Sequence, residues 1–385
     1  MSQAAVISTS ALSGVTIRAV TGFQHTTVRR KLIGANAKRD VHGWTATEPV
    51  IRIETDQGLV GTGFGGVGPD QARAILGMRL CDLWVDDVGA VGPLGRADHA
   101  IFDLVGKALG VAAWRLIGAA GPEWAPVYDT SFYFADLLPE HAARGVGRLV
   151  DEMEASLAEG HRSFKVKVGR GARWMAPNEG LARDIEVVRA LARHGGPGVQ
   201  LMADANDQFD LETAKSFLDA VGEHLIFMEE PFAETEAGDL ALKAWMRERG
   251  LATRLADGES EHDPAALERL ARAGALDVLQ PDIRAHGLTL QMRLAGAVAS
   301  LPGVSLASHN WGSYLGTYKM LQLGRGISNF MIGELDRSHS DLFDDDHWPL
   351  REGRIRVPDM PGCGLRVRED VFRAKYAPGA WRVTL

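Results

Sequence analysis

Acidic side chains end, or closely follow, three successive apolar segments in the middle of the chain. They are Asp204, Glu229 and Glu259. If the segments are neighbouring strands, the three carboxylates meet at one place, where they repel one another unless a cation lies between them. Carboxylate oxygens in a partly hydrated octahedral site suit Mg2+, with Mn2+ as an alternative. The pattern therefore predicts one magnesium ion per active site, bound by these three side chains.

Two lysines, Lys165 and Lys167, lie on the apolar segment that precedes the first of these acids. Positions i and i+2 of a strand face the same side, so both ammonium groups point into one space while Val166 points the other way. An ammonium beside a second ammonium and a metal ion is expected to have a lowered pKa. Either lysine would then be usable as a base.

Asp282 and His309 end two later segments of the same kind. A carboxylate that holds Nδ1 of an imidazole fixes the tautomer of the ring and makes the ring more basic. A single buried histidine is more often structural, but an Asp–His pair on adjacent strands favours a second acid or base.

These residues are positioned by short apolar strands that alternate with amphipathic helices from about Val127 onward. Such alternation predicts a parallel sheet, and with a strand near Val127 eight strands are available, the number that closes a barrel. The polar strand ends then converge at one mouth, with the lysines and the histidine on opposite sides of it. The later strands are expected over 164–168, 200–204, 225–229, 253–257, 277–280, 304–307 and 330–334, and helices over 179–193, 211–221, 264–273 and 289–300.

The section before Val127 has a different pattern. The segments Val50–Thr55 and Leu59–Phe64 flank a Gly-containing turn and predict a β-hairpin. Apolar periodicity predicts helices over 69–80 and 98–116. We therefore expect an α+β capping domain over 1–125, a catalytic barrel over 126–350, and a C-terminal segment over 351–385 that returns to the capping domain.

A metal site, two lysines and an Asp–His pair together suit one class of reaction. The α-proton of a carboxylate is weakly acidic, and its removal becomes feasible when a divalent metal and a cationic side chain stabilise the enediolate that forms. A Lys or His base with Mg2+ is the arrangement of enolase-superfamily sites.

The order and spacing of these motifs resemble the mandelate racemase subgroup of the enolase superfamily, over essentially the whole chain. The resemblance implies a modified TIM barrel, (β/α)7β, with an α+β capping domain made from both termini. The motifs that carry it are Lys165-x-Lys167, Asp204-x-Asn206, Glu229-Glu230-Pro231, Gly258-Glu259, Pro281-Asp282, Ser308-His309, Glu334, the helix Ala100–Gly110 and the late segment Ile355–Leu365.

Roles for single residues follow from the same resemblance. Lys167 is implied as the base for one face of the substrate, and His309, oriented by Asp282, as the acid or base for the other. Asp204, Glu229 and Glu259 are implied as the metal ligands.

Three further roles are implied around the substrate itself. Lys165 would neutralise the substrate carboxylate, and Asn206 would hold a substrate oxygen. Glu334 would hydrogen-bond to the developing enediolate, unless it pairs instead with a nearby Lys or Arg.

The family places substrate specificity in two loops of the capping domain, which here would be about Thr21–Asp40 and about Gly63–Asp70. The first is rich in cations, and a buried hydroxyl or carboxylate needs such donors. It therefore favours an acid sugar, whose distal carboxylate would meet Arg29, Arg30 or Lys31.

A polyhydroxylated substrate favours dehydration as the overall reaction. Lys167 or His309 would take the α-proton, His309 would protonate the departing β-hydroxyl, and the product would relax to a 2-keto-3-deoxy acid. A racemase or epimerase of a 2-hydroxy acid needs the same two bases, so this alternative stays open.

Two remoter interpretations concern other classes of protein. Gly61–Gly66 matches GxGxxG and Asp86 follows about 20 residues later, as in NAD-dependent oxidoreductases. The glycines, however, follow the return arm of a hairpin rather than a buried first strand. A non-catalytic binding protein on the same fold would be expected to lack a metal ligand or base, and none is missing.

Bulk composition excludes other functions. The net charge of −8 argues against a nucleic acid partner, because phosphate binding needs a basic surface. No stretch is long and apolar enough for a membrane, and Met1–Gly14 lacks the features of a signal peptide, so we expect a cytoplasmic protein. Cys81 and Cys363 are too few for a disulfide framework. The partners expected are a small carboxylate and, from the resemblance, further copies of the chain in a homo-oligomer.

Overall fold

The computed structural model describes residues 9–385 and has a barrel of parallel strands at its centre. Each strand from β6 to β11 pairs in parallel with the next one, and β13 pairs in parallel with β6. A parallel bridge between Leu306 and Phe330 joins β12 to the chain just before β13 and closes the ring. The predicted barrel is confirmed. Its strands are β6 (Trp124–Phe132), β7 (Ser163–Lys167), β8 (Gln200–Asp204), β9 (Leu225–Glu229), β10 (Arg254–Asp257), β11 (Val278–Leu279), β12 (Ser305–Leu306) and β13 (Gly333–Leu335).

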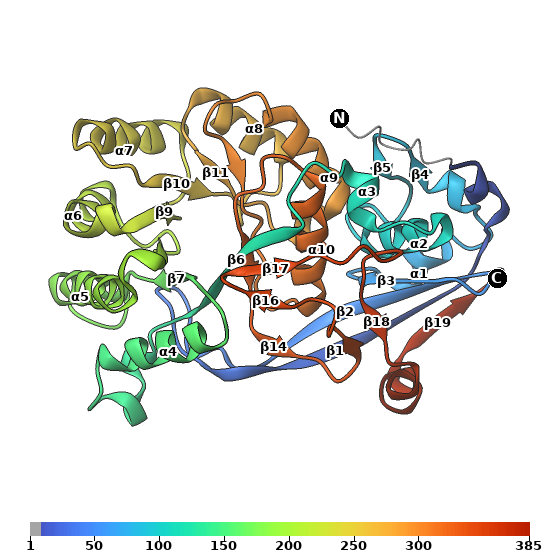
Figure 1. Cartoon of the computed structure of the whole chain (residues 1–385), viewed down its shortest axis with the longest axis horizontal. Helices are drawn as coiled ribbons and strands as arrows, with labels where there is room; N and C mark the ends of the chain where they lie inside the picture. Colours follow the sequence, from blue (N-terminus) through green and yellow to red (C-terminus); the bar gives the residue numbers. More distant parts are fainter. Residues whose placement is uncertain (1–8) are drawn as a thin grey trace.

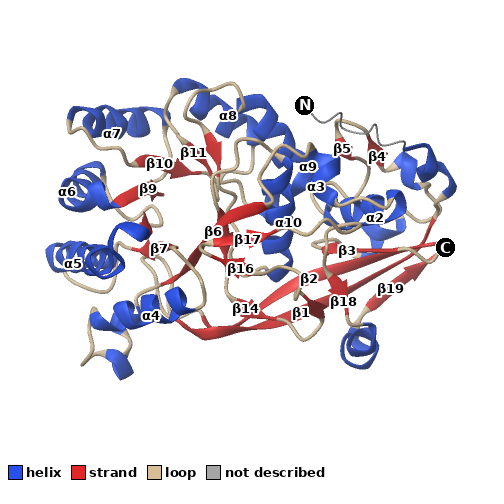
Figure 2. Ribbon diagram, in the orientation of Figure 1, coloured by secondary structure: helices blue, strands red, loops and turns tan. Residues whose placement is uncertain are grey.

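One helix follows each barrel strand except the last, which gives the (β/α)7β order within the described residues. The helices lie outside the strands, as α5, α6 and α7 show most clearly in Figure 1 and Figure 2. Side chains fix where several of them begin. Asp210, for example, accepts a hydrogen bond from the backbone N of Thr213 at 2.7 Å and so caps α6. The helices are α4 (Gly147–Ala158), α5 (Pro177–Gly195), α6 (Leu211–Val221), α7 (Glu236–Glu248), α8 (Pro264–Ala273), α9 (Ile283–Val298) and α10 (Tyr314–Gly326).

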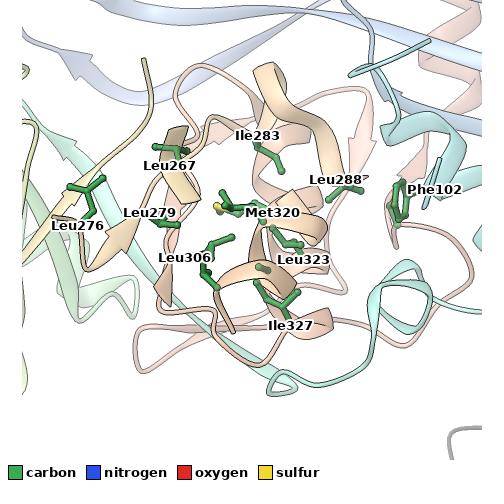
Figure 3. Packing of buried hydrophobic residues seen from close by; sticks show 14 of the residues in the cluster. Phe102, Leu267, Leu276, Leu279, Ile283, Leu288, Leu306, Met320, Leu323 and Ile327 are labelled. Atoms are coloured by element: carbon green, nitrogen blue, oxygen red, sulfur yellow. The ribbon is translucent and has the colours of Figure 1, made fainter. Parts of the chain in front are cut away.

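Alternation along the strands divides the core into two layers. Side chains on one face fill the inside of the barrel, and those on the other face pack against the helices. Figure 3 shows part of the outer layer, where Leu279 and Leu306 of the strands lie with Met320 and Leu323 of α10. The inner layer consists of Tyr128, Met202, Phe227, Ala256, Val278, Ala307 and Ile332.

An antiparallel sheet forms the cap, and its long strands run beneath the barrel (Figure 1). The predicted hairpin is confirmed, because β2 pairs with β3 from Glu54–Val60 to Val50–Phe64. Both β14 and β19 add to β1, so segments from the C-terminal half complete this sheet. Its strands are β1 (Ile17–Ile33), β2 (Gly43–Thr55), β3 (Val60–Phe64), β14 (Ser338–His339) and β19 (Trp381–Thr384).

The C-terminal segment contacts both parts of the molecule. While β19 joins the cap, β17 pairs antiparallel with β6 of the barrel. The domain limits at 125 and 350 stay predictions. The smaller elements are β4 (Trp84–Val85), β5 (Gly89–Ala90), β15 (Phe343–Asp344), β16 (Leu350–Arg351), β17 (Arg354–Arg356), β18 (Arg366–Val367) and α11 (Glu369–Val371).

Two predicted helices of the cap are shorter than expected. The first, α1 (Pro69–Arg73), ends seven residues before the predicted limit at 80. The second is interrupted at Gly110, whose φ of 69° is left-handed, so that α2 (His99–Leu109) and α3 (Ala113–Ile117) are separate helices. Among residues 9–385, no helix is long and apolar enough to cross a membrane. The sequence prediction for Met1–Gly14 lies mostly outside the described residues.

Candidate active site

A cavity of about 420 Å³ opens where the carboxyl ends of the barrel strands meet the segment between β1 and β2. Such a position is where barrel enzymes hold their active sites. The cavity contains most of the predicted catalytic residues. Its lining includes Lys167, Asn206, Glu259, Asp282, His309 and Glu334 from the barrel, and Asn36, Lys38, Arg39 and His42 from the cap.

The three predicted metal ligands lie together. Asp204, Glu229 and Glu259 each offer a carboxylate oxygen, and these atoms all lie within 4.8 Å of one another. Asp204 and Glu229 are buried, and Gln280 Nε2 donates to Glu229 Oε2 at 2.6 Å, which fixes that carboxylate. Burial, and then repulsion from Asp204, raise the pKa of Glu229 despite Lys165 nearby. A hard divalent cation fits this set of oxygen donors and would relieve the repulsion.

Both predicted lysines point into the barrel as their alternation required. Lys165 is fully buried and lies 2.9 Å from Glu334 and 3.4 Å from Asp204, and it also pairs with Glu229. Lys167 pairs with Asp204 and lines the cavity.

The direction of the lysine pKa shifts differs from the sequence prediction. Burial opposes the charged form, but the surrounding carboxylates outweigh it and raise the pKa of Lys165 and of Lys167 above their ordinary values. The prediction of a lowered pKa assumed a bound cation. In the protein alone the negative groups dominate, so a lysine can serve as a base only when their charge is neutralised.

The predicted Asp–His pair is formed. His309 Nδ1 lies 2.7 Å from Asp282 Oδ2, and its Nε2 lies 3.1 Å from Glu259 Oε2. Burial disfavours the imidazolium, yet Glu259, Glu334 and the hydrogen bond to Asp282 together raise the pKa of His309 to about 10. The contact with Asp282 therefore orients the ring beside Glu259 of the acidic triad.

Asn206 and Glu334 both line the cavity and have different partners. Asn206 Nδ2 donates to Glu230 Oε2 at 3.2 Å, while its Oδ1 is buried and has no hydrogen-bond partner within residues 9–385. Glu334 accepts from Thr130 Oγ1 at 2.6 Å and from the backbone N of Asn310 at 2.8 Å. Because Glu334 also pairs with Lys165, the alternative of a lysine partner for this residue is realised.

The three cations predicted to meet the substrate do not line the cavity. The predicted loop is largely strand, because β1 continues to Ile33. Arg29 is buried, lies 3.5 Å from Asp336 and stacks over Trp311 at 4.6 Å. Arg30 pairs with Glu159, and Lys31 pairs with Glu152.

Other side chains supply the cavity with positive charge and aromatic surface. Lys38 and Arg39, from the short segment after β1, line it, as does Arg284 after Asp282. Tyr133 stacks on Trp311, with ring centroids 4.9 Å apart and planes 28° apart. The cationic character of residues 36–39 was visible in the sequence, whereas no local signal separated Tyr133 and Trp311 from core aromatics.

The second predicted specificity loop, Gly63–Asp70, lies away from this cavity. Two glycines of the GxGxxG pattern, Gly61 and Gly63, have a packing role. A Cβ at Gly61 would lie 2.3 Å from Ala100 O, and one at Gly63 would lie 2.4 Å from Ala100 N. The GxGxxG pattern therefore reflects the close approach of β3 to α2 rather than a dinucleotide site.

Fold and cavity define an acid–base enzyme of the barrel class, in which an acidic triad lies between a lysine and an Asp–His pair. Residues 148–371 match the enolase C-terminal domain-like family. The chain belongs to this family and to the mandelate racemase subgroup of the enolase superfamily.

Similar proteins of known name cover most of the chain. A galacturonate dehydratase from Geobacillus sp., solved with D-galacturonate and 5-keto-4-deoxy-D-galacturonate, has 32% identity and a TM-score of 0.89 over 96% of this chain and 99% of its own. D-galactarolactone cycloisomerase of Agrobacterium fabrum is 27% identical over 84% of this chain and 89% of its own length. The 3,6-anhydro-alpha-L-galactonate cycloisomerase of Streptomyces coelicolor is 31% identical over 82% and 87%.

Proposed function

We propose that the protein is a magnesium-dependent dehydratase of an acid sugar. The observation that carries this proposal is the placement of Lys167 and the His309–Asp282 pair around one acidic triad in a polar cavity. Similarity to dehydratases that act on arabinonate, xylonate and galacturonate supports it.

The first step in this proposal is removal of the proton on the carbon next to the substrate carboxylate. Asp204, Glu229 and Glu259 would hold the Mg2+, which would stabilise the negative charge that develops on that carboxylate. Lys165, buried at the floor of the site, contributes a positive charge there. Lys167 is placed to accept the proton once the nearby carboxylates are neutralised.

The second step is loss of the hydroxyl on the next carbon. The electron pair left by the proton forms a carbon–carbon double bond as the carbon–oxygen bond breaks. His309, whose ring is oriented by Asp282, would donate a proton to the leaving hydroxyl, so that water departs. The enol that remains relaxes to a 2-keto-3-deoxy acid, or to the matching keto-deoxy acid of a uronate.

Hexuronates are the first substrates to consider. The Geobacillus relative was solved with D-galacturonate and its keto-deoxy product. In this chain, Lys38, Arg39 and Arg284 supply donors at the cavity wall for hydroxyls distant from the reacting carboxylate.

The test is incubation of the protein and Mg2+ with a library of uronates, aldonates and aldarates in D2O, followed by proton NMR. Loss of a β-hydroxyl with a new deoxy-methylene signal identifies a dehydratase and its substrate. Deuterium at the α-carbon with every hydroxyl retained identifies a racemase or epimerase instead. A sugar lactone and an anhydro sugar acid are added to the library, and an isomer formed from either without loss of a hydroxyl identifies a cycloisomerase, as two relatives are named.

Two further predictions concern the oligomeric state and the cellular location of the protein. A homo-oligomer is expected, and light scattering on the purified chain would measure its mass. A cytoplasmic location is expected from the sequence and can be measured by cell fractionation.

A further inference from the structure

A second group of carboxylates does not line the active-site cavity. Asp207, Glu234 and Asp257 each offer an oxygen atom, and these atoms all lie within 4.8 Å of one another. Asp207 follows β8, Glu234 precedes α7, and Asp257 ends β10. None of the three is among the predicted ligands of the active-site metal, Asp204, Glu229 and Glu259.

The second group lies on the outer side of the strands. Within β10, Ala256 belongs to the barrel interior and Leu255 to the outer layer. Because alternate residues face opposite sides, Asp257 points outward with Leu255. The catalytic Asp204 and Glu229, by contrast, share the inward face of Met202 and Phe227.

Two of these carboxylates each have one oxygen anchored and one oxygen free. Asp257 is 1% exposed, its Oδ1 accepts from the backbone N of Gly258 at 2.7 Å, and its Oδ2 has no hydrogen-bond partner among the described residues. Asp207 Oδ2 pairs with Lys38, and its buried Oδ1 likewise has no partner. A buried carboxylate oxygen without a donor costs free energy, so these two atoms need a ligand.

A fourth acid increases the imbalance of charge. Asp239 of α7 is 1% exposed, and neither of its carboxylate oxygens has a partner in the described part of the chain. Burial, and then repulsion from Glu234, raise the pKa of Asp239 to about 7.

Few positive groups are near enough to balance these acids. Lys38 already pairs with Asp207. Lys243, which lowers the pKa of Asp239, donates its own hydrogen bond to Asp277 at 2.6 Å. Two explanations are therefore possible. Either the acids are protonated, or they bind a cation other than the one expected between Asp204, Glu229 and Glu259.

We propose that Asp207, Glu234 and Asp257 bind a second hard divalent cation, Mg2+ or Mn2+, on the outer side of the barrel. All donors are carboxylate oxygens, which suit such ions, and the free oxygens of Asp207 and Asp257 are already oriented by their anchored partners. The ion joins the loops after β8 and β9 to the end of β10. Because Asp207 also pairs with Lys38, the ion restricts the movement of Lys38 at the cavity wall.

The number of Mn2+ ions bound per chain tests this proposal. Titration of the metal-stripped full chain, followed by electron paramagnetic resonance of free aqueous Mn2+, should show two ions per chain at saturation. Asp257→Asn keeps the shape of the side chain and should reduce the count from two to one, as should Glu234→Gln. Glu229→Gln alters a predicted ligand of the active-site metal and should remove that ion instead. The double variant Asp257→Asn/Glu229→Gln should bind no ion.

Matched controls and opposite outcomes are available. Glu223→Gln alters an acid whose side chain is 77% exposed and should still bind two ions. A count of one in the unaltered protein would overturn the proposal and favour protonated acids. A count of two in both Asp257→Asn and Glu234→Gln would also overturn it, whether or not the protein proves to be a dehydratase.

Discussion

Asp282 holds His309 with one carboxylate oxygen and begins helix α9 with the other. Oδ2 lies 2.7 Å from His309 Nδ1, while Oδ1 accepts from the backbone N of Arg284 and of Ala285, each at 2.8 Å. The backbone N of Ile283 also donates to His309 O at 3.0 Å. The orientation of the imidazole is therefore tied to the short turn that opens α9, which Gly287, with φ of 68° and ψ of −177°, separates from the rest of the helix.

This double role predicts separable effects of two substitutions. Asp282→Asn can still accept hydrogen bonds at the helix start, but it no longer stabilises the charged imidazole. We expect kcat to fall by roughly 10²–10⁴-fold, with unfolding free energy changed by less than about 1 kcal/mol. Asp282→Ala should lose the cap as well, and so lower stability by about 1 kcal/mol more. Steady-state kinetics and urea unfolding measure both effects, and unchanged kcat in Asp282→Asn would contradict the role.

The two-base arrangement predicts loss of turnover when either base is removed. Lys167→Ala and His309→Asn should each lower kcat by roughly 10²–10⁴-fold, since each removes a proton-transfer group. Lys375→Ala is a suitable control, because that lysine is 57% exposed and pairs with Asp341 far from the cavity. Full turnover in both active-site variants would refute the arrangement.

Substitution of a residue that does not itself bind the metal should weaken the affinity for Mg2+. Gln280 donates to Glu229 Oε2 at 2.6 Å, so Gln280→Ala frees that carboxylate to rotate. Such outer partners contribute roughly 10–100-fold to metal affinity, and we expect a loss of that size. The Mg2+ concentration for half-maximal activity measures it. Chelation with EDTA should abolish activity, and added Mg2+ should restore it.

Substrate affinity should depend on cations that line the cavity and not on those beside it. Arg39→Ala removes a donor from the cavity wall, so KM for an acid sugar should rise by about tenfold with kcat little changed. Arg30→Ala, whose partner is Glu159 outside the cavity, should leave KM unchanged. Equal effects of the two substitutions would show that the cavity wall has been misassigned.

Asp98 predicts a pH dependence of stability that is remote from the metal ligands. Its carboxylate accepts from the backbone N of Leu288 at 2.9 Å and of Thr289 at 2.7 Å. Burial outweighs these bonds and raises the pKa of Asp98 to about 6 from an ordinary value near 3.8. The folded state then binds this proton more tightly than the unfolded state, so the contribution to stability is present below pH 4 and is lost as pH rises through 6.

The loss amounts to about 3 kcal/mol for a shift of roughly two pKa units. Asp98→Asn should remove this slope, although its absolute stability can be lower because one hydrogen bond is changed. Urea unfolding of both proteins at pH 4 and pH 7 gives the difference in slope. Parallel slopes would show that Asp98 does not titrate in this range.

Much of the fold and the central site followed from simple periodicity. The i, i+2 rule placed Lys165 and Lys167 on one face, and the strand ends brought Asp204, Glu229 and His309 to one mouth. These predictions succeeded because barrel closure converts a position along the sequence into a position in space.

Pairing between distant segments was not accessible in the same way. Arg29, Arg30 and Lys31 looked like loop cations, but β1 extends through them and their acidic partners come from the barrel and from the chain after β13. The interruption at Gly110 was also missed, because an apolar pattern that continues across a glycine still reads as one helix. The direction of the lysine pKa shifts depended on the balance between carboxylates and metal, which no spacing reveals.

The pairing of β1 with β14 restricts how molecules reach the cavity. Val28 pairs with His339 and Arg29 with Ser338, just after barrel strand β13, and Arg29 also reaches Asp336. Rigid-body movement of the cap away from the barrel would break these contacts. The segment 34–42, which contributes Asn36, Lys38, Arg39 and His42 to the cavity wall, is also held to the barrel. Trp174 Nε1 donates to Asn36 O at 2.7 Å, the backbone N of Phe134 donates to Ala35 O at 2.9 Å, and Lys38 pairs with Asp207. Cap and barrel are therefore expected to keep their relative positions while substrate enters and product leaves.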